Sequence, residues 1–518
     1  MLTTQLKQRG SLALLCLICT LPAFGQSLRV QCPGSTPLHP DAAHQIPGKV
    51  YPGQIKCQQV AGTDGFATMG DGTQTYLFGF GPLSGIDLIS KGLPGTLPAD
   101  QFNAQYNNPD LPGMQVSMTD GSLSAVPDPL YDPSLPINTT AAVANPAGMM
   151  NAGVLSAQQP APLVAIDEDD ELFLTLSNVG MIMRPDLFEQ HTIHFHGYPN
   201  ASTYFDGVPD VSVAVNISGS MTYYYTAPPA GTYFWHCHIT PPEHLQMGMI
   251  GQLYVRPRQN RVAVGANLHD ALAAHNTATN SCTSTDPDWL TCDSPLPPAN
   301  TVVQTTGAKY AYDDGDGSTR YDVEYPIMVM GFDPNFHWTG MTFNAEDFSG
   351  MKDKYFLLNG RSYPDTVQDE ILATGPAGDN LRTQDPDGLA RSSQPVRTHI
   401  IIDRSKGQTR ALLRISDLST TEVTTLATVG IPMTVIAKDS RMLRDLDGNN
   451  LFYNTNSITM GGGSTMDVIL DASDTLNIPA GTYFLYTTNL DHLSNDNENF
   501  GGEMTEITVI GNTVVAAQ

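Results

Sequence analysis

The sequence lacks two features that mark common classes of protein: a long apolar run and an excess of basic residues. Outside the first 25 residues, no stretch approaches the roughly 20 apolar residues that a membrane-spanning helix needs. Lys and Arg number 25 against 52 Asp and Glu, which gives a formal net charge of -27. This acidity argues against nucleic acid and anionic membrane surfaces as partners. Cationic or neutral substrates fit the charge better, although acidity also keeps an exported protein soluble.

The N-terminal residues have the pattern of a secretory signal. Lys7 and Arg9 precede an apolar run from Leu12 to Leu21, and the segment ends on Ala23, Phe24 and Gly25. This order predicts a signal peptide over residues 1–25 and a mature protein that is secreted or periplasmic.

After removal of that signal, five of the seven cysteines remain, an odd number for an oxidising compartment. Two short loops are available for disulfides, Cys32 with Cys57 and Cys282 with Cys292. This pairing leaves Cys237 alone between two histidines. A free thiol in that setting predicts a metal ligand, with an inert buried thiol as the alternative.

Strand patterns dominate, and helical periodicity is scarce. Short apolar alternations bounded by Gly, Pro, Asn and Asp recur, as at 172–176, 221–226 and 466–470. They predict an all-β architecture of sandwiches. The segment AGTYF occurs at 230–234 and again at 480–484, each time after an alternating strand. This repeat predicts two similar domains.

We expect a first domain at residues 26–256 and a second at 301–518, joined by a polar linker at 257–300 that holds a cysteine pair. A Pro- and Gly-rich stretch at 97–162 interrupts the strand pattern of the first domain as a long loop. The second domain has Tyr-Thr-Thr at 486–488, where the first has His-Cys-His. We therefore expect the second domain to lack copper ligands.

Six of the thirteen histidines lie in two segments, HTIHFHG at 191–197 and HCHITPPEHLQMGM at 236–249. Residues two apart on a strand point to the same face. The paired histidines of each segment can therefore reach a common metal region, while Cys237 points to the opposite face. One strand would thus serve two metal sites. The paired histidines are His194, His196, His236 and His238.

The ligand types favour copper. A thiolate, two imidazoles and a weak thioether make the trigonal copper site of one-electron transfer proteins. Zinc is the main competitor, but its sites usually have four strong ligands. The Pro-Pro pair at 241–242 forbids a regular ladder, so we expect a tight loop there. The candidate ligands are His191, Cys237, His244 and Met249.

These two segments resemble the signatures of the multicopper oxidases and their cupredoxin relatives. Residues 191–197 are similar to that family's H-x-x-H-x-H-G, and residues 236–249 to its H-C-H-(x)n-H-x-x-x-G-M. The resemblance implies two cupredoxin-like Greek-key β-sandwich domains. It implies type 1 copper on His191, Cys237 and His244, with Met249 axial. It implies type 2 and type 3 coppers on His194, His196, His236 and His238.

Asp206 belongs to the same resemblance. It opens the run Asp-Gly-Val-Pro at 206–209, which is similar to the family's D-G-x-P, whose acid assists proton delivery to oxygen. A plain Asp-Gly turn is the alternative interpretation.

The sequence departs from the family's pattern in two respects. His244 lies two residues further from Cys237 than in most laccase-like members. The family's oxygen-reducing cluster takes eight histidines from four H-x-H strands, whereas this chain has two such strands. We therefore expect a homo-oligomer in which two chains share one cluster around a two-fold axis.

The resemblance implies a laccase-like multicopper oxidase of the two-domain bacterial type. Such an enzyme couples one-electron oxidation of a phenolic or metal-ion reductant to the reduction of dioxygen to water. Two alternatives remain open: a copper enzyme similar to nitrite reductase, and a non-catalytic cupredoxin for electron transfer or copper handling. Neither nucleic acid nor membrane is an expected partner.

Overall fold

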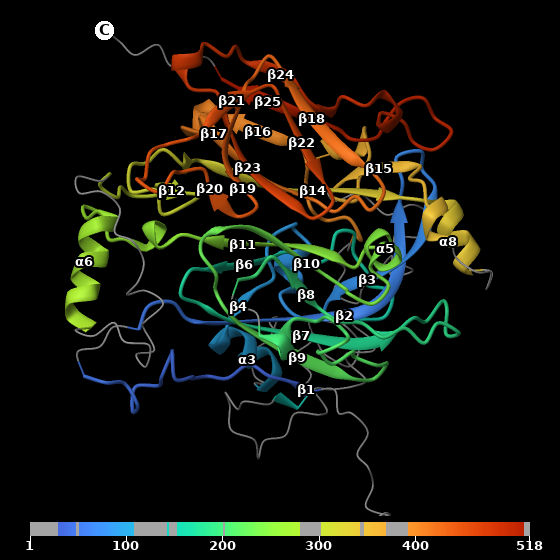
Figure 1. The fold of residues 1–518 in the computed structure, drawn as a ribbon, viewed down its shortest axis with the longest axis horizontal. Helices are drawn as coiled ribbons and strands as arrows, with labels where there is room; N and C mark the ends of the chain where they lie inside the picture. The colour runs from blue at the N-terminus through green and yellow to red at the C-terminus, as the bar shows by residue number, and fades with distance from the viewer. Residues whose placement is uncertain are drawn as a thin grey trace, which may run out of the picture.

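The chain is built mainly from strands, which form two sandwiches stacked on each other (Figure 1). None of the helices in the described ranges has the length and apolar character of a membrane span. The computed structural model describes residues 29–47, 51–107, 142–143, 153–199, 202–279, 302–341, 347–368 and 392–511.

The first sandwich, blue to green in Figure 1, consists of a five-stranded sheet and a four-stranded sheet. The five-stranded sheet has the order β3-β2-β7-β9, with β4 beside β2. The four-stranded sheet has the order β6-β11-β10-β8. The strands are β2 (Ile55–Thr68), β3 (Gln74–Pro82), β4 (Leu97–Pro98), β6 (Val164–Asp167), β7 (Glu171–Gly180), β8 (His194–His196), β9 (Ser220–Thr226), β10 (Gly231–His236) and β11 (Ile250–Arg256).

The second sandwich, yellow to red in Figure 1, also has two sheets. One has the order β15-β14-β17-β23-β19-β20, with β21 paired to β19, and the other has the order β16-β25-β24-β18-β22. The strands are β14 (Val323–Phe332), β15 (Tyr355–Leu358), β16 (Ile400–Asp403), β17 (Arg410–Asp417), β18 (Val423–Val429), β19 (Met433–Lys438), β20 (Arg441–Met442), β21 (Tyr453–Thr455), β22 (Ser457–Gly461), β23 (Ser464–Asp471), β24 (Gly481–Thr487) and β25 (Met504–Ile510). Two short ladders, β1 (Arg29–Val30) with β5 (Ala142–Val143) and β12 (Lys309–Tyr310) with β13 (Arg320–Tyr321), complete the strands.

The two sandwiches repeat one topology. The repeated AGTYF segments become β10 and β24, and each pairs antiparallel with the last strand of its sandwich, β11 or β25. Each last strand in turn pairs parallel with an earlier strand, β6 or β16. The predicted all-β fold of two cupredoxin-like Greek-key sandwiches is confirmed, and the sequence repeat marks equivalent strands.

The sandwiches share a hydrophobic core. The largest buried cluster contains Trp235 and Cys237 of the first sandwich together with Met328, Met330 and Leu357 of the second. A separate cluster fills the interior of the second sandwich. The stacking is therefore a packed apolar interface, and it brings β10 beside β17 and β23.

The described residues include several segments for which the sequence makes local predictions. The Cys32–Cys57 disulfide is present, while Cys282, Cys292 and the signal peptide lie outside the described residues. The predicted long loop contains helix α3 (Ala99–Asn107), and the predicted linker contains helix α6 (Leu268–Thr279). The domain boundaries at 256 and 300 stay predictions.

Candidate metal centre

The candidate ligands lie on or next to three elements: β8, the end of β10, and a short helix, α5 (Pro241–Gln246). His191 precedes β8, Cys237 and His238 follow β10, and Met249 lies between α5 and β11. The tight loop expected after Cys237 is thus helical. Its two prolines occupy the first helical positions, where a missing N–H costs nothing because that group has no intrahelical partner. The helix turns the chain back, so that His244 faces Cys237.

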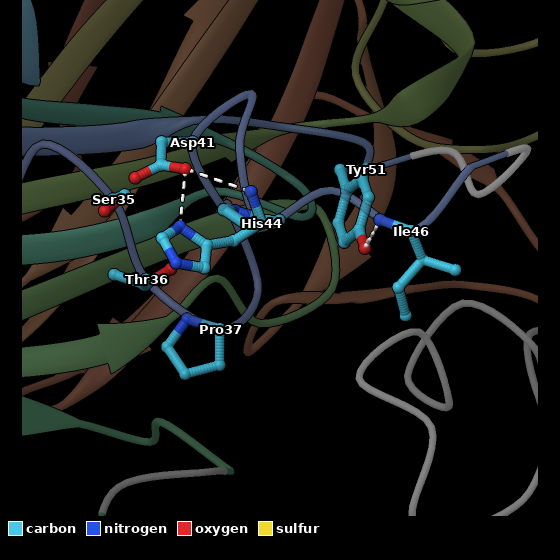
Figure 2. Close-up of a pocket in the computed structure, with 8 residues that line it drawn as sticks. Ser35, Thr36, Pro37, Asp41, His44, Ile46 and Tyr51 are labelled. Carbon is cyan, nitrogen blue, oxygen red and sulfur yellow. Dashed lines mark hydrogen bonds and ion pairs between the residues drawn. The ribbon is translucent and has the colours of Figure 1, made fainter.

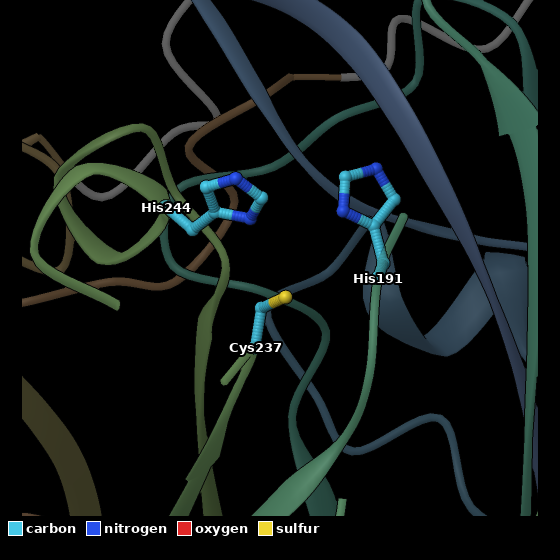
Figure 3. Close-up of side chains that lie close together, drawn as sticks. All are labelled: His191, Cys237 and His244. Atoms are coloured by element: carbon cyan, nitrogen blue, oxygen red, sulfur yellow. The ribbon is translucent and has the colours of Figure 1, made fainter. Parts of the chain in front are cut away.

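The first group of ligands consists of His191, Cys237 and His244. One nitrogen of each ring and the sulfur lie within 4.8 Å of one another. In Figure 3 the Cys237 sulfur points into the space between the two rings. A metal bound about 2.0–2.3 Å from each ligand needs ligand atoms about 4–4.6 Å apart at most. The 4.8 Å limit on the three separations is close to this range, so the three side chains are near enough to hold one ion.

The hydrogen bonding of this group suits a metal. His191 is fully buried, yet neither ring nitrogen has a hydrogen-bond partner among the described residues. Unpaired buried polar atoms are costly and rare in proteins. The Cys237 sulfur accepts N–H bonds from Thr192, at 3.4 Å, and from Ile239, at 3.5 Å. The donor set and its open positions fit copper.

The field at the first group favours a positive charge. Burial, with some repulsion from His244, holds the pKa of His191 well below its usual range, so its ring stays neutral and keeps a lone pair. Burial also opposes charging of His244. Cys237 and Glu189 outweigh that effect and raise the pKa of His244 to about 10. A cation between these groups would meet the same attraction.

Met249 is fully buried, and its carbonyl oxygen accepts the Cys237 N–H at 3.0 Å. This bond places the Met249 backbone beside that of Cys237.

Sequence reasoning missed two residues around the first group. The Glu189 carboxylate lies 3.6 Å from His244 Nε2, and its side chain is 33% exposed. Glu189 therefore links the buried His244 ring to the protein surface. Gly62 makes room for His191, because a Cβ there would lie 2.6 Å from the ring. A lone glutamate and a strand glycine have no sequence signal that separates them from others.

The second group consists of His194, His196 and His236, whose ligating nitrogens also lie within 4.8 Å of one another. Burial lowers the pKa of His236 to about 3, so this ring is neutral at ordinary pH. His238 does not meet the 4.8 Å limit with this trio. Its ring is nevertheless adjacent, with its centre 5.1 Å from that of His194, compared with 5.7 Å between His194 and His196.

Hydrogen bonds set the tautomers in the second group. His194 Nδ1–H donates to the main-chain oxygen of Asp206 at 2.6 Å, and the Asp206 carboxylate lies 3.5 Å from the same nitrogen. His236 Nδ1–H donates to the Cys237 oxygen at 2.8 Å. Both rings therefore present Nε2 for a metal. Asp206 thus lies against a candidate ligand.

The histidines near the N-terminus do not form a third centre. His44 lies in a shallow surface hollow and pairs with Asp41 at 2.6 Å (Figure 2). Both ring nitrogens of His39 are used, by Glu171 and by the Pro52 oxygen.

Comparisons with known proteins agree with the site. The family model described as multicopper oxidase matches residues 131–259. Laccase abr2 of Aspergillus fumigatus is 32% identical over 109 residues, which cover 21% of this chain and 17% of that laccase. The iron transport multicopper oxidase FET3 of Gibberella zeae is 36% identical over 100 residues, 18% of this chain and 15% of that protein. The match thus spans less than a fifth of these relatives' lengths.

Among solved structures, the blue copper oxidase from Nitrosomonas europaea aligns over 88% of this chain and 86% of its own, with 17% identity and a TM-score of 0.47. The family-model match covers the segments that carry the candidate ligands. Residues 131–259 of this chain are thus similar to the multicopper oxidases, whose model they match.

Proposed function

We propose that this protein is a laccase-like copper oxidase that couples one-electron oxidation of a phenolic or metal-ion reductant to the reduction of dioxygen to water. The observation that supports this most strongly is the adjacency of the two ligand groups. Cys237 belongs to the first group and its bonded neighbour His236 to the second. A covalent path of one peptide unit therefore joins a one-electron site to a cluster of imidazoles.

In this proposal His191, Cys237, His244 and Met249 hold type 1 copper, and His194, His196, His236 and His238 hold type 2 and type 3 coppers. Bound copper would supply single-electron transfer at the first group and dioxygen reduction at the second. The chain's part is to keep His191 and His236 neutral. It also orients the Nε2 atoms of His194 and His236 and buries the Cys237 sulfur. Asp206, against His194, is the candidate for moving protons to reduced oxygen.

Glu189 favours a cationic reductant. Its carboxylate is part-exposed and lies beside His244, and the whole chain carries a formal charge of -27. Both features attract positive ions to the outer side of the first group. A relative bears the name iron transport multicopper oxidase, and a metal-ion substrate for this chain is in line with that name. Export of the chain, expected from residues 1–25, belongs to the same proposal.

The second group has four histidines, half of the family's usual set. We propose that a second copy of the chain supplies the other half around a two-fold axis. The alternative of an electron carrier, or of a copper-handling protein, is favoured by one observation: the ligating nitrogens that lie within 4.8 Å of one another belong to three of the four histidines, without His238. The other alternative is an enzyme similar to nitrite reductase. In that case nitrite, in place of dioxygen, would reoxidise the reduced protein.

The test is copper content per chain, measured with optical and paramagnetic resonance spectra and the mass in solution. A dimer with about 2.5 coppers per chain, reoxidised by dioxygen, is the expected result, because two type 1 sites and one three-copper cluster would be shared by two chains. One copper per chain with a type 1 signal alone would make the protein a carrier. Reoxidation by nitrite, and not by dioxygen, would favour the nitrite reductase alternative.

A further inference from the structure

Gln246 is the last residue of α5, two residues after His244 and three before Met249. Its side chain is buried, with 2% exposure, although glutamine is mostly found at protein surfaces. Its amide N–H groups donate to Asp353 Oδ1 and to Thr420 Oγ1, the latter at 2.9 Å. Both acceptors belong to the second sandwich.

The amide oxygen of Gln246 accepts two further bonds from the second sandwich. The donors are the Asp333 N–H and His337 Nε2–H, each at 3.0 Å. The amide therefore uses all four of its hydrogen-bonding positions. Its orientation is unambiguous, because a backbone N–H cannot accept and the Asp353 carboxylate lies at the donor end.

These partners are themselves held in place. His337, on α8 (Pro334–Met341), stacks on Phe332 with ring centres 4.7 Å apart. The second oxygen of Asp353 accepts the Thr421 hydroxyl at 2.7 Å. Gly331 gives Asp353 its place, since a Cβ there would lie 1.9 Å from Asp353 Oδ2. Figure 1 shows α5 beside α8 at this edge of the molecule.

We propose that Gln246 is a positioning residue, through which the second sandwich holds α5 and thereby sets His244 and Met249 for copper in the first group. A six-residue helix is too short to be stable alone, so its place depends on such contacts. This inference rests on the proposed copper site. It gives the second sandwich a role at that site although its repeated motif has no copper ligands.

The test compares Gln246→Leu with Gln252→Leu in the full-length, copper-loaded protein. Gln252 lies on β11, is 1% exposed and donates to the Arg414 oxygen at 2.7 Å and to Ser416 Oγ at 2.8 Å. It therefore crosses the same interface away from α5. We expect both variants to unfold at lower temperature, because each loses buried hydrogen bonds.

The blue absorbance, the paramagnetic resonance signal and copper retention against a chelator distinguish the two variants. Gln246→Leu is expected to change both spectra and to weaken copper binding roughly tenfold, as loss of contacts that orient metal ligands typically does. Gln252→Leu is expected to match the unaltered protein in all three measurements.

Gly331→Ala provides a second route if Gln246→Leu does not fold. The added methyl displaces Asp353 and removes one of the four bonds, so a smaller spectral change in the same direction is expected. Unchanged spectra and copper retention in both variants would overturn the inference, as would equal changes in Gln252→Leu. If the unaltered protein itself binds copper without a type 1 signal, the proposed function fails together with the inference.

Discussion

At the scale of single residues, Cys237 is the side chain that joins the two ligand groups. Its sulfur is buried beside His191 and His244, and its backbone continues directly from His236. A thiolate bonded to copper is the source of intense blue colour in such sites, and an alcohol does not replace it. The blue absorbance expected of this protein therefore depends on the Cys237 sulfur.

We expect Cys237→Ser to abolish the blue absorbance while the fold is retained. Serine is close to cysteine in size, and the Thr192 and Ile239 N–H groups can donate to its oxygen as they do to the sulfur. Absorption and circular dichroism spectra check the two halves of this prediction. Tyr486→Phe, in the equivalent strand of the second sandwich, is the control and should stay blue. Persistent blue in the Cys237 variant would disprove the ligand assignment.

At the scale of elements, β17 ends in a buried carboxyl group. Asp417 is fully buried; its Oδ1 accepts the Ser419 N–H at 2.9 Å, and its Oδ2 has no partner among the described residues. Burial raises its pKa to about 6 from an ordinary 3.8. The neighbouring Glu503 carboxyl has its pKa raised as well, by burial and by repulsion from Asp417 and Asp353.

The folded protein therefore binds this proton more tightly than the unfolded chain does. The resulting stabilisation is present below about pH 4 and is lost as the pH rises to about 6. We expect Asp417→Asn to raise the free energy of unfolding at pH 7.5 by about 1–3 kcal/mol. The gain should shrink towards zero at pH 4. Denaturant titrations at the two pH values measure it, and a loss of stability at pH 7.5 would contradict the prediction.

At the scale of the whole molecule, charged side chains are buried where the two sandwiches meet. Arg414 on β17 is fully buried; its Nε lies 3.0 Å from Glu324, and its guanidinium lies 4.8 Å from the ring of Tyr254 on β11. Arg256 of the first sandwich binds the same Glu324 at 3.2 Å. Together with the shared apolar core, these contacts couple the sandwiches, so we expect a single unfolding transition.

Arg414→Met should destabilise the protein by about 3 kcal/mol, because it leaves the part-buried Glu324 with one cationic partner in place of two. Lys406→Met is the matched control. Its pair with Asp403 is exposed on the lysine side by 71%, so its loss should cost less than about 1 kcal/mol. Calorimetry measures both variants. Equal effects would mean that the buried pair contributes little to the coupling.

The sequence by itself determined the all-β class, the repeat, the Cys32–Cys57 disulfide and the candidate ligands. Each of these depends on short-range information: alternation along a strand, a short loop between cysteines, or the spacing of His and Cys within 14 residues or fewer. The family resemblance uses the same local motifs. Such patterns involve residues that are close together in the sequence, so they can be recognised without knowledge of the tertiary structure.

Tertiary structure alone decided what surrounds the ligands. Gln246 meets Asp353 across 107 residues, and the core joins Cys237 with Met328 and Leu357. The helical form of α5 and the position of Glu189 likewise follow from packing. Contacts between distant residues depend on the whole arrangement of sheets, because many pairs of buried polar residues are possible and folding selects the few that satisfy one another.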